Sequence, residues 1–243
     1  QLKIGTRAVE ETDGIPTNNE TVLHSLRVYA FVDGQPAGHF YTKDGLDVNN
    51  PSFLMHLTMY STMTQKVDFY VVANEAAMET PGSAVLLTEN TTETQLNHFT
   101  FTKLNTSKGL PMFCKQTETI DLTQLSDKTP ADPGHAGHTL LRQDLTFELK
   151  RPIGKLGVFA AKPVGENSSL RVTGLTVLAS GTRTRNYLMP QTDETLKAIT
   201  GITGDISLEV VEEEVTKTLA ENASQTDKEN PANYTPVLNE SFY

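Results

Sequence analysis

The sequence predicts an all-β fold, a β-sandwich built from short strands. Its apolar residues mostly alternate with polar ones, as in a strand with one buried face, and seldom recur every three or four positions as in a helix. Several short runs are rich in β-branched and aromatic residues, and 16 Gly and 12 Pro separate them as turn signals. Many short strands divided by turns are typical of a sandwich.

The first two core strands are expected to form a hairpin. One apolar run covers Leu26–Val32 and ends at Asp33-Gly34, and the return run covers Gly38–Thr42. Asp-Gly between two such runs favours a type I′ turn, because both central residues of that turn need a positive φ.

Further strands are predicted along the rest of the chain. Residues Phe69–Ala73 are β-branched and apolar on both faces, which predicts a strand in the middle of a sheet. The other predicted strands cover residues 53–59, 117–122, 140–149 and 170–179.

Helical signals are few. Residues 91–97 fit one or two turns of helix. Val211, Val215 and Leu219 lie four apart, so 211–222 fits a helix, although the preceding 206–211 fits a strand equally well. The polar stretch 222–234 is expected to be a loop or a mobile strip.

A polar break at Gly165–Ser169 predicts a boundary between two domains. The first would cover residues 1–165. The second would cover residues 166–243, which is short for an independent sandwich, so we expect a short or incomplete β domain there.

Composition excludes several classes of protein. The chain has 30 acidic and 20 basic residues among its 243, a net charge of −10, so it lacks the basic footprint of a nucleic-acid binder. No apolar run approaches the ~18–20 residues that span a bilayer. A single cysteine, Cys114, rules out an intrachain disulfide.

No group of residues predicts catalysis, a metal site or a cofactor site. His135 and His138 stand in a Pro/Gly loop without further ligands, and a solvated loop is the simpler interpretation. Cys114 reads as a small buried apolar residue, because no histidine can be assigned to activate it. Glu212–Glu214 fits a solvated face better than a calcium site. No nucleophile elbow and no phosphate-binding glycine loop is present.

Charge is distributed unevenly. Residues 141–185 carry eight basic and three acidic side chains, whereas residues 201–243 carry nine acidic and two basic ones. Ordinary solvated surface explains this pattern. The alternative is a pair of complementary ends that help identical subunits meet head to tail.

Three stretches, in this order and spacing, resemble the fimbrillin family of Bacteroidetes, the pilus subunits of the FimA and Mfa type. They are a central strand that ends in Ala-Asn, a Leu-Pro-Met step, and an alternating strand followed by Arg and a small-Lys-apolar step: Phe69–Asn74, Leu110–Met112 and Leu145–Leu156. The strand Leu26–Phe31 also fits the family's first core strand, and Ser241–Tyr243 is similar to the start of a later one. Phe113-Cys114 and Gly154 depart from the family pattern.

The resemblance implies two tandem transthyretin-like β-sandwich domains and a role without catalysis. It implies a structural subunit of a surface pilus (fimbria), made as an outer-membrane lipoprotein precursor and matured by an Arg-specific protease. Trimming of an N-terminal strand would let a strand of the next subunit take its place. An accessory or tip adhesin of the same pilus, binding host glycan or protein, is the alternative, and a transthyretin-like carrier or hydrolase module is a third.

The first residues suit such an exchange. Residues 2–9 alternate, which places Leu2, Ile4 and Thr6 on one face of a strand. The resemblance implies proteolytic processing between Arg7 and Ala8, which would free this strand and uncover an edge for another one. The plain alternative is that Arg7 is an ordinary charged residue of an N-terminal segment.

Overall fold

The computed structural model describes thirteen stretches of the chain: residues 2–5, 22–43, 52–61, 63–80, 83–84, 86–126, 140–141, 144–154, 157–177, 185–192, 195, 206–208 and 213–237. Packing divides the chain into two compact units. Unit 1 comprises residues 1–9, 17–152 and 185–192, and unit 2 comprises residues 10–16, 153–184 and 193–243. The predicted domain boundary at 165 stays a prediction.

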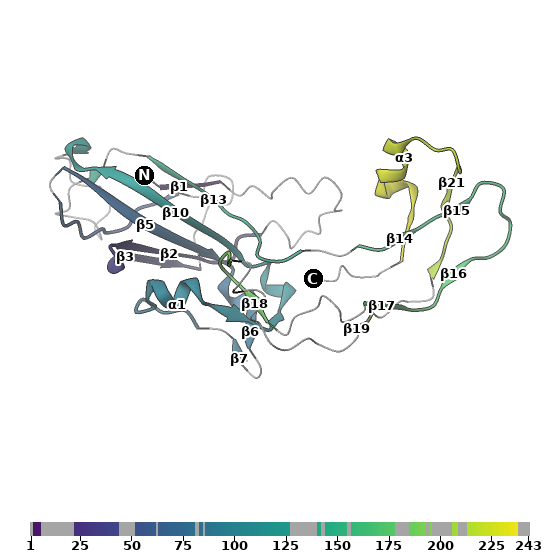
Figure 1. The fold of residues 1–243 in the computed structure, drawn as a ribbon, viewed down its shortest axis with the longest axis horizontal. Coiled ribbons are helices and arrows are strands. Elements are labelled where there is room, and N and C mark those ends of the chain that lie inside the picture. The colour runs from purple at the N-terminus through teal and green to yellow at the C-terminus, as the bar shows by residue number, and fades with distance from the viewer. Residues whose placement is uncertain are drawn as a thin grey trace. The chain divides into compact units, whose positions relative to one another are not determined.

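Unit 1 contains a four-stranded antiparallel sheet (Figure 1). Its order is β10-β5-β2-β3, and β5 pairs with β10 along its full length. The central position predicted for Phe69–Ala73 is confirmed, because the strand that contains it is bonded on both sides. The strands are β2 (Leu26–Val32), β3 (Gln35–Thr42), β5 (Thr64–Ala73) and β10 (Met112–Asp121).

The predicted hairpin is confirmed. β2 and β3 pair antiparallel and are joined by Asp33 and Gly34, whose φ values are 49° and 76°. Both values lie in the left-handed region that a type I′ turn requires. A β-bulge between Ala30 and Phe31 shifts the register near the turn.

A second, three-stranded sheet of unit 1 has the order β13-β1-β4. It combines β1 (Leu2–Gly5), β4 (Ser52–Phe53) and β13 (Leu145–Glu148). β1 runs parallel to β13 and antiparallel to β4. Three segments that are far apart in the sequence therefore form one small sheet.

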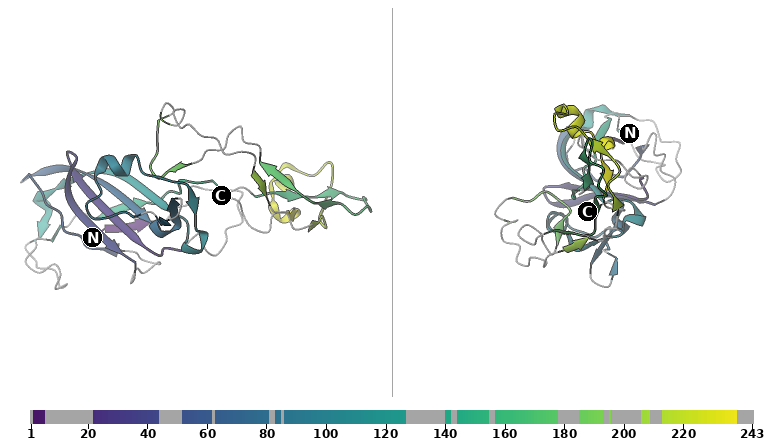
Figure 2. Two further views of the ribbon diagram at one scale, coloured as in Figure 1. Left: turned by 90° about the horizontal axis from the view of Figure 1, so that it is seen from below. Right: turned by 90° about the vertical axis from the view of Figure 1, so that its right-hand side faces the viewer.

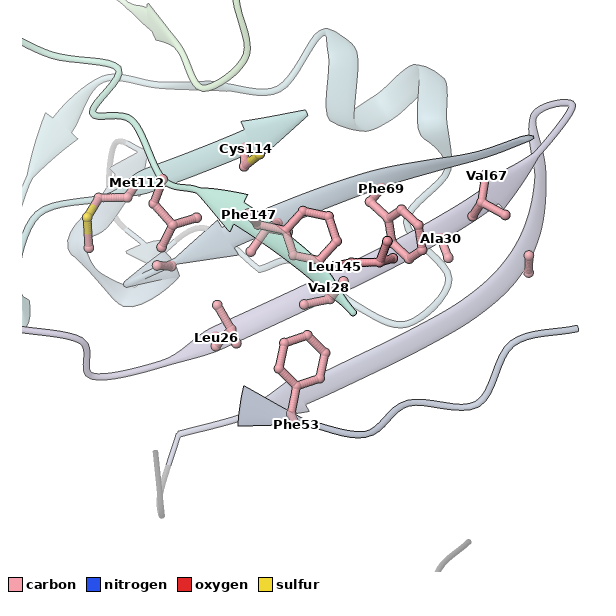
Figure 3. Close-up of a cluster of buried hydrophobic side chains, with 14 of the residues drawn as sticks. Leu26, Val28, Ala30, Phe53, Val67, Phe69, Met112, Cys114, Leu145 and Phe147 are labelled. Carbon is pink, nitrogen blue, oxygen red and sulfur yellow. The ribbon is translucent and has the colours of Figure 1, made fainter. Parts of the chain in front are cut away.

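The two sheets enclose the main hydrophobic core (Figure 3). The Phe69 ring of one sheet lies 5.2 Å from the Phe147 ring of the other, and Phe40 stacks on Phe53 at 4.5 Å. Each fully buried side chain of this size contributes about 1.5–3 kcal/mol to folding. Unit 1 is thus a β-sandwich, and the predicted all-β fold is confirmed.

The outer face of the four-stranded sheet is covered as well. Side chains alternate along a strand, so Tyr29 and Tyr70 point away from the sandwich core. Their hydroxyls donate to the Thr88 carbonyl at 2.8 Å and to Glu93 Oε1 at 2.8 Å. Glu93 begins the short helix α1 (Glu93–Asn97), which confirms the helix predicted at 91–97.

Shorter elements complete unit 1. They are the strands β6 (Met78–Thr80), β7 (Ser83–Ala84), β8 (Thr100–Phe101), β9 (Lys103–Leu104), β11 (Leu125–Ser126), β12 (Leu140–Leu141) and β18 (Asn186–Tyr187), and the 3-10 turns η1 (Glu75–Ala77), η2 (Thr106–Lys108) and η3 (Leu122–Gln124).

Unit 2 consists of two-stranded pairings: β14 with β22, β15 with β21, β16 with β20 and β17 with β19. Thr235 is buried, and its hydroxyl oxygen accepts from the backbone N–H groups of Thr216 and Lys217 at 3.0 Å each. The elements are β14 (Phe159–Ala160), β15 (Lys162–Pro163), β16 (Arg171–Val172), β17 (Leu175–Val177), β19 (Ile206–Leu208), β20 (Glu213–Glu214), β21 (Thr218–Leu219), α3 (Gln225–Glu229), η6 (Pro231–Asn233) and β22 (Thr235–Pro236). In Figure 2, residues 213–237 of unit 2 are drawn in yellow-green to yellow.

Two predicted elements of unit 2 are wrong. The helix proposed for 211–222 is absent from its described part, where β20 and β21 lie instead. Val215 is buried and its N–H donates to the Leu170 carbonyl at 2.8 Å, so strand pairing overrides the spacing of its apolar residues. The predicted loop at 222–234 contains α3, whose N-cap Ser224 accepts from the Asp227 N–H at 3.1 Å.

Three predicted strands have different bounds. The strand at 117–122 begins earlier, at Met112, and those at 140–149 and 170–179 are each interrupted. The strand at 53–59 is wrong beyond Phe53. Met55, Leu57 and Met59 pack against the core. The one backbone hydrogen bond described between this stretch and β3 runs from the Thr58 N–H to the Ala37 carbonyl. The alternation of apolar residues therefore predicted the buried face correctly, although the stretch does not form a hydrogen-bonded strand.

Among the described residues, no helix has the length and apolar character needed to cross a membrane.

Candidate functional site

The candidate site is the position of β1 within its sheet. Leu2 and Ile4 are in parallel register with Leu145 and Phe147 of β13, and Leu2 is also in antiparallel register with Phe53 of β4. All three of these neighbours are buried, with 0–7% of their surface exposed. β1 is therefore the middle strand of this sheet and not an edge strand, and the residues in register with it belong to the hydrophobic core.

This position has a direct mechanical consequence. β4 and β13 belong to chain segments near residues 52 and 145, and β1 stands between them. Removal of β1 would leave one unpaired edge on each neighbour, facing each other across a space one strand wide. Two unpaired edges over an apolar floor form a template for another extended segment.

β13 is held independently of β1. Beyond its end, Lys150 and Phe113 exchange two backbone hydrogen bonds, at 2.8 and 2.7 Å, which tie the segment to β10. The Gln116 side chain adds a bond to the Thr146 carbonyl at 3.2 Å. The segment that contains β13 is therefore bonded to the four-stranded sheet through contacts that do not involve β1.

Asn74 joins two of the stretches on which the family resemblance rests. It has a left-handed φ of 55°, and its side-chain amide donates to the carbonyls of Val22 and Leu110 at 2.8 Å each. Its side-chain oxygen accepts from the His24 N–H at 2.7 Å. Asn tolerates this backbone conformation better than most residues, so one side chain fastens the end of β5 to the chain segments that precede β2 and β10.

Gly109 fits against this clamp. Its φ is 83°, and a Cβ at this position would lie 2.6 Å from the Asn74 amide nitrogen. Sequence reasoning noted the Ala-Asn and Leu-Pro-Met steps but not that they meet. The left-handed preference of Asn at the end of a buried strand is the signal for such a clamp.

A buried charged cluster on the outer face of β2 was also missed. The Arg27 guanidinium donates to both carboxylate oxygens of Glu75, at 2.6 and 2.8 Å, and lies 3.9 Å from the centre of the Tyr41 ring. Its Nη1 is 3.0 Å from His39 Nε2. A charged residue inside the apolar run 26–32 is the sequence signal, because a buried charge needs a partner.

Electrostatics follow from this geometry. Burial alone lowers the pKa of Arg27, but the hydrogen bonds and charge of Glu75 outweigh it, so the pKa lies above its usual value. Burial and the neighbouring Arg27 charge lower the pKa of His39. His39 is therefore held neutral, with Nε2 as acceptor for the guanidinium.

The remaining candidate residues fall into three groups: a buried cysteine, exposed histidines, and residues outside the described part of the chain. Cys114 is buried in the core as expected, and burial raises the pKa of its thiol. His24, His56 and His98 are exposed, and the described residues contain no cluster of three or more His, Cys, Asp or Glu that could hold a metal. Thr6, Arg7, Ala8, His135, His138 and Glu212 lie outside the described residues.

Comparisons with known proteins give structural neighbours only. No family model and no curated protein matches the chain. A fimbrial assembly protein from Parabacteroides distasonis aligns at 15% identity and a TM-score of 0.49, over 97% of this chain and 83% of its own. The tip fimbrial protein Mfa3 from Porphyromonas gingivalis aligns at 15% identity and a TM-score of 0.41, over 94% of this chain and 74% of its own.

Proposed function

We propose that this chain is a structural subunit of a bacterial surface pilus that polymerises by exchange of its first strand. The supporting observation is the placement of β1 between β13 and β4, above the buried Leu145 and Phe147. Loss of β1 from this position would open a strand-shaped slot between β13 and β4.

The energetics suit an exchange. Leu2 and Ile4 of β1 are in register with the buried Leu145 and Phe147 of β13, and a Leu or Ile buried at each of these positions would contribute about 1.5–3 kcal/mol. Four paired residues give a weak hold, so β1 can be displaced once it is cut from the chain. A longer donor strand with more apolar anchors would bind in its place more tightly.

Processing by an Arg-specific protease between Arg7 and Ala8 would supply the cut. Because the slot and the donor strand are different surfaces, the contact is heterologous and extends into an open filament. The partners are then other pilus subunits, joined head to tail. The location is the cell surface, reached as an outer-membrane lipoprotein precursor, and the role needs no catalysis, cofactor or metal.

An accessory or tip adhesin of the same kind of pilus is the second candidate. A tip subunit needs the slot for its neighbour and a separate surface for a host glycan or protein. The observation that favours it is a surface cavity beside α1, on the opposite face of the four-stranded sheet from the slot.

Digestion with an Arg-specific protease tests the proposal. The wild-type chain, alone or with partner subunits, should lose its first residues and form ladders of oligomers on a gel. The matched control is Arg7→Lys, which keeps the positive charge but removes this cleavage site, and it should remain monomeric. A trimmed wild-type chain that stays monomeric with partner subunits present would contradict strand exchange.

A further inference from the structure

We infer that the cavity beside α1 is a binding site for a neutral saccharide. This inference rests on the second candidate of the proposed function, the adhesin, and names its ligand class; it requires no strand exchange. The cavity measures about 670 Å³ and lies between residues 86–91 and 95–100 of unit 1. That volume is typical of pockets for small molecules.

The cavity wall is apolar over most of its area, and its described residues carry almost no charge. Within the described part of the chain, its lining residues include neither Asp, Glu, Lys nor Arg, and His98 is the single titratable side chain among them. The chain as a whole is acidic, with a net charge of −10. An anionic ligand would meet repulsion and no compensating cation, so the wall favours a neutral ligand.

Several polar groups of the wall remain available. Within the described residues, the exposed Asn90 carboxamide has no hydrogen-bond partner. Gln95 uses its side-chain oxygen to accept from the Thr92 N–H at 2.8 Å, which leaves its amide nitrogen free to donate. His98 Nδ1 lies 2.9 Å from the Thr94 carbonyl and donates to it, which leaves Nε2 as the ring nitrogen available to a ligand.

This set of groups matches sugar hydroxyls. A hydroxyl both donates and accepts, and the wall offers amide donors, an amide acceptor and an imidazole nitrogen. Apolar surface is present too, since Leu86 is 84% exposed and Phe99 is half-buried. Apolar and aromatic side chains suit the C–H face of a pyranose ring, whereas an entirely apolar ligand would leave the polar groups unpaired.

The wall is fixed by hydrogen bonds to other parts of unit 1 and within α1. The Tyr29 hydroxyl donates to the Thr88 carbonyl at 2.8 Å, and the Leu188 N–H donates to the Phe99 carbonyl at 3.0 Å. Thr92 and Gln95 form a capping box at the start of α1. A wall held in place before binding loses little conformational entropy when a ligand arrives.

The strand slot and this cavity lie on opposite faces of the four-stranded sheet. Phe69 points to the sandwich core and contacts Phe147, whereas its neighbour Tyr70 points to α1 and bonds Glu93. Filling the slot therefore does not cover the cavity, and both functions are compatible in one molecule.

An array of immobilised glycans with neutral, sialylated and sulfated termini tests the inference on the full chain. We expect retention on neutral glycans, weakened about three- to tenfold by Asn90→Ala and by His98→Ala, as the loss of one hydrogen bond implies. Asn167→Ala, an exposed Asn of unit 2, is the matched control and should bind as wild type. Melting temperatures of all three variants should equal that of the wild type.

Three results would overturn the inference. They are the absence of retention on every neutral glycan, retention confined to charged glycans, or retention that both cavity variants leave unchanged. Each of these outcomes leaves the protease test of polymerisation untouched, because Asn90 and His98 lie away from β1 and its neighbours.

Discussion

Ile4 stands in parallel register with Phe147, whose ring is fully buried between the two sheets of unit 1. This relationship links the first few residues of the chain to its main hydrophobic core. It makes the stability of unit 1 depend on the short strand β1, and that dependence can be measured residue by residue.

The first prediction compares two neighbouring positions of β1. Ile4→Asp should lower the free energy of unfolding by at least about 1.5–3 kcal/mol, because the register position of Ile4 faces a buried residue and a carboxylate there is costly. Lys3→Asp is the matched control, since its partner Thr146 is exposed, and it should change stability by less than about 0.5 kcal/mol. Thermal unfolding of both variants tests this prediction. Equal melting temperatures would show that Ile4 does not contribute to the hydrophobic core.

The second prediction concerns the Asn74 clamp. Asn74→Ala should lower the free energy of unfolding by about 3–4 kcal/mol, because three hydrogen bonds are lost and Ala is strained at positive φ. Asn74→Gly relieves the strain but not the lost bonds, so its cost should be about 1 kcal/mol smaller. Urea unfolding measures both values; a Gly variant no better than Ala would mean that backbone strain is not part of the clamp.

The third prediction concerns the Arg27–Glu75 pair. The two side chains are 8% and 12% exposed, so removing either partner leaves a nearly buried charge. Arg27→Met and Glu75→Leu should each cost about 3–5 kcal/mol, and the double variant should cost clearly less than their sum. Additive losses in a double-mutant cycle would show that the two groups act independently.

The fourth prediction is a pH dependence from His39. Its pKa is lowered in the folded state by burial and by Arg27, while Glu75 and Glu89 act in the opposite direction. The unfolded chain therefore binds more protons just below the usual pKa near 6.5, so stability falls as the pH drops through that range. His39→Gln keeps an acceptor for Arg27 and should flatten the profile of melting temperature between pH 7 and pH 5. An unchanged slope would place the sensitive group elsewhere.

The elements that were predicted correctly carry a local signal. The dipeptide Asp33-Gly34 predicts a type I′ turn. Residues Phe69–Ala73 are apolar on both faces, as in an inner strand. Where the prediction failed, tertiary pairing outweighs local pattern. Val215 belongs to a segment with helical spacing, yet it sits between short strands because a backbone partner at Leu170 is in reach. The stretch 222–234, which was expected to be a loop, contains the helix α3. Its N-cap, Ser224, lies in a polar run without an apolar pattern that would indicate a helix.

The candidate site was likewise predicted only in part. Alternation in residues 2–9 predicts a strand with Leu2 and Ile4 on one face, and the register agrees with it. That β1 lies between β4 and β13, and not at an edge, depends on contacts across about 50 and 140 residues, which local pattern does not encode. The Arg27 cluster was missed for the same reason, because its partner Glu75 follows a different strand.

Returning the first strand as a peptide tests the central claim most directly. A chain that begins at Ala8 should form oligomers, and a synthetic peptide of residues 1–7 should suppress them and restore the melting temperature of the uncut protein. The same peptide with Ile4→Asp should do neither, because the charge cannot occupy the position beside Phe147. Equal effects from both peptides, or none from the native one, would contradict the account that β1 fills a slot for an exchanged strand.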